Sequence, residues 1–157
     1  MGDYYKTVEE SERPTNWQQV EAFILERVLE YPEKEIAGHL ATDENEILEL
    51  YHAIGTDHRC VMFTKLSDDK EYVDGALEFL RRNNKEMDVR KLEPYKDGMN
   101  IIICYHSHPD ETEVTLADRV EFIGYPRNNS SRFLFYGVLY SHANFYWFDK
   151  RNGTIIE

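Results

Sequence analysis

The sequence predicts a mixed α/β (α+β) domain, in which a central, mostly antiparallel sheet of about six strands packs against about three helices. Stretches with an apolar residue every three or four positions alternate along the chain with short runs rich in branched and aromatic residues. Polar turn residues separate these stretches. The 157 residues, of which 41% are hydrophobic and 13% aromatic, are enough for one domain with its own core.

The first helix is predicted to follow residues 1–14, which lack periodicity and are expected to form a flexible lead-in to a domain spanning 15–157. Thr15 or Asn16 can cap this helix, and Pro32 ends it. Its apolar stripe is formed by Trp17, Val20, Ile24, Val28 and Tyr31.

Two strands, 35–40 and 47–54, are expected next, joined by a polar turn at Asp43-Glu44-Asn45, with a third strand at 59–66. A second helix should begin after the cap residues 67–69 and stop at Asn83-Asn84. Its apolar positions are Val73, Ala76, Leu77 and Leu80. Residues 85–98 are charged and contain a proline and a glycine, so they are expected to form an irregular connector.

The second half of the chain predicts a buried strand from Ile101, a third helix over 115–124 and a polar loop over 125–132. The aromatic and branched residues of 133–141 and 145–148 predict two further strands. Asn152-Gly153 indicates a tight turn before a short strand at 154–156.

Charge and composition exclude several classes of function. A net charge of −12 argues against a nucleic-acid partner, because phosphate binding needs a basic face, although a basic polypeptide tail remains compatible with it. Cys60 and Cys104 lie in apolar runs and indicate buried thiols rather than disulfides, which is typical of a reducing compartment. No segment has the pattern of a signal peptide or a membrane span, so a cytoplasmic protein is expected.

His106 and His108 form the clearest candidate site. Residues i and i+2 of a strand point to the same face with Cα atoms about 6–7 Å apart, so both imidazoles can reach one ion. Pro109 ends the strand, Ser107 should point to the other face in a structural role, and Asp118 can supply a third ligand. Two imidazoles and one carboxylate with an open fourth position are typical of a catalytic zinc site.

Simpler interpretations stand beside this one. Two histidines on a strand can be half-exposed and bind nothing. Thr115-x-x-Asp118 also fits a capping box that only stabilises a helix. Competing carboxylates occur nearby, at Asp110, Glu111 and Glu113, and are expected to be solvated. The other histidines are expected to be structural or solvated: His39, His52, His58 and His142.

Zinc hydrolysis also needs a group that takes a proton from the attacking water. The spacing of residues alone does not select this base among the many glutamates of the chain. Three segments taken together do: the sequence EIAG beginning at Glu35, the sequence HSHP beginning at His106, and Thr115-x-x-Asp118. In this order they resemble the JAB/MPN domain with an intact JAMM motif, whose fold is cytidine deaminase-like.

The resemblance covers most of the chain and implies a role for each motif residue. By position, His106, His108 and Asp118 would bind one catalytic Zn²⁺, and Glu35 would be the general acid/base. Thr115 takes the place of the family's serine, whose hydroxyl helps to stabilise the oxyanion. Threonine keeps the hydroxyl but adds a methyl that restricts χ1, and the loop over 109–115 is about one residue shorter than the usual family spacing.

The function implied is that of a deubiquitinase-like zinc metallopeptidase. Such an enzyme cleaves after the C-terminus of a ubiquitin-like protein, either removing it from conjugates or processing its precursor. The compact chain is more similar to prokaryotic JAB proteins, which act beside E1- and E2-like enzymes, including in antiviral systems. Two alternatives are a non-enzymatic MPN interaction scaffold and a metallo-hydrolase acting on a small amide or a sulfur-carrier adduct.

Overall fold

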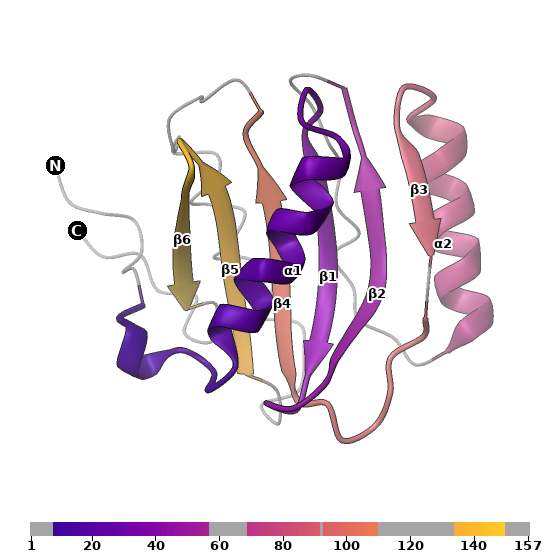
Figure 1. Ribbon diagram of the computed structural model, residues 1–157. Coiled ribbons are helices and arrows are strands. Elements are labelled where there is room, and N and C mark those ends of the chain that lie inside the picture. The colour runs from indigo at the N-terminus through magenta and orange to yellow at the C-terminus, as the bar shows by residue number, and fades with distance from the viewer. Residues whose placement is uncertain (1–7, 57–68, 92, 110–133, 150–157) are drawn as a thin grey trace, which may run out of the picture.

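The computed structural model describes residues 8–56, 69–91, 93–109 and 134–149. Their strands form one six-stranded sheet in the order β3-β2-β1-β4-β5-β6 (Figure 1). Only the pair β4–β5 is parallel, so the predicted mixed α/β class with a mostly antiparallel sheet is confirmed. The strands are β1 Ile36–Thr42, β2 Ile47–Ile54, β3 Asp88–Lys91, β4 Ile101–Ser107, β5 Leu134–Ser141 and β6 Asn144–Asp149. The helices are a short 3₁₀ helix Glu10–Glu12, α1 Trp17–Glu30 and α2 Lys70–Asn83.

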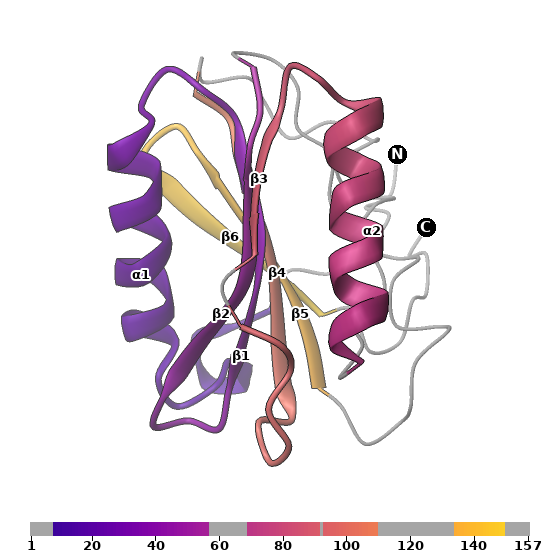
Figure 2. The ribbon, with the colours of Figure 1, turned by 90° about the vertical axis from the view of Figure 1, so that its right-hand side faces the viewer.

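Helices α1 and α2 cover opposite faces of the sheet (Figure 2). Because side chains alternate along a strand, each central strand contributes apolar residues to both layers. The α1 layer includes Val20, Ile24, Val28, Ile36, Leu40, Ile103, Tyr105, Val138 and Trp147. The α2 layer includes Tyr51, Ala53, Val73, Leu77 and Val89, and a neighbouring cluster on that face contains Ala41, Ile102 and Cys104. No helix within the described residues is long and apolar enough to cross a bilayer.

The helices α1 and α2 begin and end close to their predicted bounds. In α2 the Asp69 side chain accepts a hydrogen bond from the backbone N–H of Tyr72, as expected of a cap. At the start of α1, by contrast, Asn16 occupies the cap position without capping through its side chain. Its Nδ2 donates instead to Oγ1 of Thr42, 2.8 Å away at the end of β1. Asn16 therefore ties the helix to the sheet.

The expectation of an irregular connector over 85–98 is wrong, because this segment contains β3. The strand pairs antiparallel with β2, and its one aliphatic side chain, Val89, is fully buried. Asp88 and Arg90 alternate to exposed positions. Four mostly charged residues give almost no strand signal, and charge is common on edge strands, where it discourages pairing with other chains.

The turn between β1 and β2 lies at the predicted position. Oδ1 of Asp43 accepts hydrogen bonds from the backbone N–H groups of Glu46 (2.9 Å) and Asn45 (3.0 Å). These bonds hold the pKa of the Asp43 carboxyl below its usual value. Strand β1 itself runs two residues further than expected, to Thr42.

The first described residues contact the last strand. The backbone N–H of Val8 donates to the carbonyl of Trp147 in β6, 2.9 Å away. The guanidinium of Arg13 lies over the rings of Trp17 and Trp147, at 4.8 and 5.5 Å from their centroids. Trp147 is buried in the core.

Several predicted elements lie outside the described residues. They are the third strand at 59–66 with Cys60, the third helix at 115–124, the loop at 125–132, and the final turn and strand at 152–156.

Replacing Gly38 by alanine should lower the free energy of unfolding by about 1–3 kcal/mol, because a Cβ there overpacks the core. That atom would lie 2.6 Å from the hydroxyl oxygen of Tyr105 and 2.7 Å from its Cζ, and Tyr105 is fully buried. Gly75→Ala is the matched control, since nothing lies within 4 Å of its Cβ position in α2. It should stabilise the protein by about 0.5–1 kcal/mol. Urea unfolding of both variants checks this, and a Gly38→Ala variant as stable as the parent would contradict it.

Candidate metal centre

The two histidines and Glu35 meet where β1 begins and β4 ends. The two strands are antiparallel neighbours, with Ala37 paired to His106. Glu35 directly precedes β1, and His108 directly follows β4. The antiparallel pairing therefore brings a glutamate from the first part of the chain beside histidines from its second half. By alternation along β4, His106 lies on the face opposite α1, the same face as Cys104.

The three side chains lie close enough together to hold one metal ion. One carboxylate oxygen of Glu35 and one ring nitrogen of each histidine all lie within 4.8 Å of one another. The imidazole centroids are 5.3 Å apart with their planes tilted by 48°. His106 is buried, at 3% exposure, while Glu35 is only partly buried. The two imidazoles therefore lie close enough together to reach one ion, as alternation along the strand predicts.

Backbone hydrogen bonds hold each member of the group in place. The N–H of Glu35 donates to the carbonyl of Thr56 (2.7 Å), and the N–H of Gly55 donates to the carbonyl of Glu35 (2.8 Å). On the other side, the N–H of His108 donates to the carbonyl of Tyr140 in β5, 2.9 Å away. Glu35 and His108 thus continue the ladders of the sheet, although both lie just beyond their strands.

Ser107 joins the two halves of the site. Its buried hydroxyl oxygen accepts a hydrogen bond from the backbone N–H of Ile36, 3.1 Å away. Ile36 follows Glu35 and Ser107 follows His106 in the chain, so this contact keeps the two strands in register beside the group. The structural role expected for Ser107 agrees with this contact, whereas local sequence gave no indication of its partner.

The residues present fit a divalent metal. Two imidazoles and a carboxylate are ligands for zinc and for other first-row metals. The remaining predicted site residues, Thr115 and Asp118, lie outside the described residues, as do the three competing carboxylates between Pro109 and Thr115.

The described histidines outside this group have other surroundings. His39 is buried in β1 with its ring edge-on to Tyr51, at a centroid distance of 4.8 Å. His142 lies in the exposed turn between β5 and β6. His58 lies outside the described residues.

His52 belongs to a buried charged network that the sequence analysis missed. Arg27 of α1 makes two hydrogen bonds to the carboxylate of Glu49, at 2.7 and 3.0 Å, and Nδ1 of His52 lies 3.3 Å from the same carboxylate. A bulge makes this possible: Tyr51 pairs with His39 and Glu49 with Leu40, so one β2 residue is unpaired and positions 49 and 52 share a face.

The electrostatics of this network follow from burial and hydrogen bonding. Burial acts to raise the pKa of the Glu49 carboxyl, but the hydrogen bonds to His52 and Arg27 outweigh it and hold that pKa below its usual value. The same contact with Glu49 raises the pKa of the Arg27 guanidinium. Both groups are therefore charged at neutral pH.

No family model matches this chain, and no curated protein or solved structure matches it either. Function is therefore inferred from the motif residues and from the geometry that brings them together.

Proposed function

We propose that this protein is a zinc-dependent isopeptidase or peptidase of the JAB/MPN family, which cleaves the bond after the C-terminus of a ubiquitin-like protein. The observation that supports this most strongly is the meeting of Glu35 with His106 and His108 within 4.8 Å. These residues belong to separate segments of the JAMM-like motif. Nothing in the local pattern around Glu35 requires it to lie beside a histidine pair.

The residues divide the chemistry between them. His106 and His108, with Asp118, would hold the metal, and Zn²⁺ when bound supplies a Lewis acid that lowers the pKa of water to about 7. Glu35 accepts a proton from the attacking water and returns it to the departing amine. The Thr115 hydroxyl stabilises the oxyanion of the tetrahedral intermediate.

The proposed substrate is a ubiquitin-like protein, either in a conjugate or as a precursor, with E1- and E2-like enzymes as functional partners. In this proposal an extended C-terminal tail reaches the group at the ends of β1 and β4. A bacterial ubiquitin-like conjugation or antiviral system, in the cytoplasm, is the setting that we propose.

Zinc content and cleavage of a panel of ubiquitin-like fusion proteins test the proposal together. We expect one zinc per chain, and cleavage after the C-terminus of at least one ubiquitin-like protein that is lost with a chelator and restored by zinc. His106→Ala should lose the zinc, because it removes one of the buried ligands. His142→Ala, in the exposed turn, is the matched control and should keep both zinc and activity.

The same measurements separate the alternatives. Protein without zinc that leaves every fusion intact would indicate the interaction scaffold. Protein that binds one zinc but cuts no fusion would indicate a hydrolase of small amides or sulfur-carrier adducts.

A further inference from the structure

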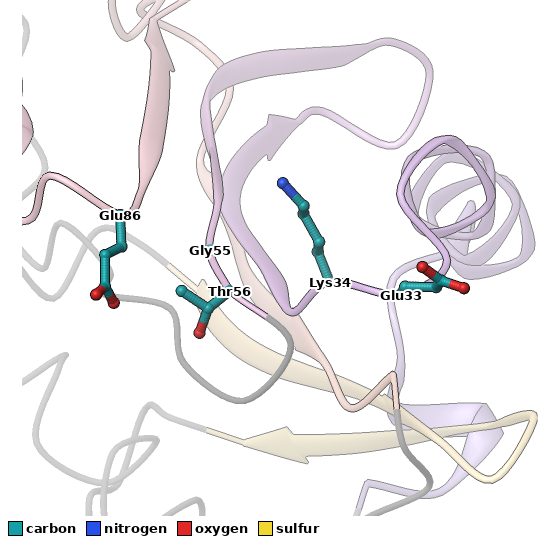
Figure 3. A pocket seen from close by; sticks show the side chains of 5 residues that line it. All are labelled: Glu33, Lys34, Gly55, Thr56 and Glu86. Carbon is teal, nitrogen blue, oxygen red and sulfur yellow. The ribbon is translucent and has the colours of Figure 1, made fainter.

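A groove of about 550 Å³ lies between the residues that precede β1 and those that follow β2. It is lined by Glu33, Lys34, Gly55, Thr56 and Glu86 (Figure 3). Gly55 and Thr56 are the residues whose backbone groups hold Glu35 in place, so the groove lies against the backbone segment that is paired with Glu35. Its volume lies within the range of about 300–1,000 Å³ that is typical of ligand sites.

The groove contains charged side chains without partners. Lys34, Glu33 and Glu86 are all exposed, and in the described part of the chain none of them forms an ion pair. Figure 3 shows the Lys34 side chain between the two glutamates, with its ammonium directed away from both carboxylates. The ammonium is therefore available to a ligand.

Among the charged residues that line the groove, Lys34 is the one next to Glu35 in the chain. It directly precedes Glu35, at a Cα distance of about 3.8 Å, and its backbone N–H donates to the carbonyl of Tyr31, 3.1 Å away. Glu86 comes instead from the connection between α2 and β3. The net charge of −12 is spread over the whole chain and is screened beyond about 8 Å at physiological ionic strength. Glu33 and Glu86 also line the groove, but Figure 3 shows the ammonium directed away from both of their carboxylates, so the ammonium is the charge that an incoming carboxylate meets at contact distance.

We infer that this groove is a substrate subsite and that Lys34 is a specificity-determining residue, which pairs with an aspartate or glutamate within three residues of the scissile bond. The inference rests on the proposed peptidase function. The ligand class is an extended polypeptide segment carrying a carboxylate, whose backbone runs past Glu35 while its acidic side chain enters the groove.

Short internally quenched peptides test this specificity. Each has one scissile bond and carries Asp, Ala or Lys at one of three positions on either side. At one of these positions, the kcat/KM of wild-type protein with zinc should be roughly two- to fivefold higher for the Asp peptide than for the Ala peptide. This is the effect expected of a solvent-exposed ion pair. Lys34→Glu should reverse the preference between the Asp and Lys peptides, whereas Lys34→Arg should keep it.

Lys96→Glu is the matched control. It changes the net charge equally, but Lys96 is exposed and lies 3.8 Å from Glu46, which directly precedes β2, far from the groove. This variant should keep the wild-type preference for Asp. If it shifts the preference as strongly as Lys34→Glu does, the effect comes from the overall charge and the inference is wrong.

A binding measurement makes the result independent of turnover. The Asp, Ala and Lys peptides, labelled with a fluorophore, are titrated with wild-type protein and with Lys34→Glu, and anisotropy gives each Kd. Tighter binding of the Asp peptide by wild type, lost in Lys34→Glu, supports the subsite even if no peptide is cut. Equal Kd values for the three peptides, or no binding at all, overturn it. Cleavage without a charge preference overturns the subsite while leaving the peptidase function intact.

Discussion

Glu35→Gln is expected to lower turnover by at least about 100-fold, the lower end of what general acid/base catalysis contributes. The amide has nearly the shape of the carboxylate but does not accept a proton from water at neutral pH. Zinc binding should remain close to that of wild type, since His106, His108 and Asp118 are unchanged. Single-turnover cleavage of a fusion substrate and the zinc content of the purified variant measure the two effects separately.

Glu46→Gln is the control for this substitution. The chemical change is the same, but Glu46 directly precedes β2, at the opposite end of the sheet from Glu35, so both cleavage and zinc binding should be unaffected. Two outcomes would contradict the assignment. Normal turnover in Glu35→Gln would exclude Glu35 as the base. A loss of zinc as large as that in His106→Ala would instead make Glu35 a metal ligand, which the 4.8 Å grouping also allows.

Glu49→Gln is expected to reduce the free energy of unfolding by about 3 kcal/mol, because it leaves a partly buried guanidinium without its main partner. The Glu49 side chain is 6% exposed and that of Arg27 is 22% exposed. We expect the lower end of the usual range for broken buried pairs, since Arg27 keeps a second partner in Glu30, 2.8 Å away. Urea unfolding at pH 7 measures the difference.

Glu78→Gln is a close control, because Glu78 also contacts two arginines, Arg81 and Arg82, at 3.5 and 3.1 Å. These groups lie on the exposed side of α2, where solvent screens each pair, and the expected loss is under about 1 kcal/mol. A similar loss in both variants would show that burial does not strengthen the Glu49 pair.

The contribution of Glu49 should depend on pH in a defined direction. Its pKa is lowered in the folded protein, so the native state favours the ionised carboxylate more than the unfolded chain does. The stabilisation is present above the unfolded pKa of about 4.3 and is lost as the pH falls through the lower folded pKa. The stability gap between wild type and Glu49→Gln should therefore be large at pH 7 and shrink below about pH 4. A gap that widens in acid would contradict the assigned direction.

The histidine pair could be predicted from sequence because it depends on one strand only. Alternation along β4 places His106 and His108 on the same face whatever the strand pairs with. Three other features also depend only on residues that are close together in the chain: the turn at Asp43, the buried stripe of α1 and the end of α2 at Asn83. Each follows from side-chain spacing, or from side chains that bond to their own backbone.

The elements that could not be predicted depend on partners distant in the chain. Strand β3 has a single buried aliphatic side chain, Val89, and becomes a strand because β2 offers it a free edge. Residues Glu49 and His52 share a face only because of the bulge opposite β1. The groove around Lys34 forms only because three segments lie side by side: the residues before β1, the residues after β2, and the connection between α2 and β3.

The sequence by itself therefore determined the mixed α/β class and the facing imidazoles, since both arise from the period of side chains along single elements. It also supplied Glu35 as a candidate, through the resemblance of three separated segments to one motif. Only the tertiary structure decided that Glu35 lies within reach of the histidines. That proximity requires β1 and β4 to pair antiparallel with Ala37 opposite His106, and such a register is set by packing across the whole sheet rather than by residues near Glu35.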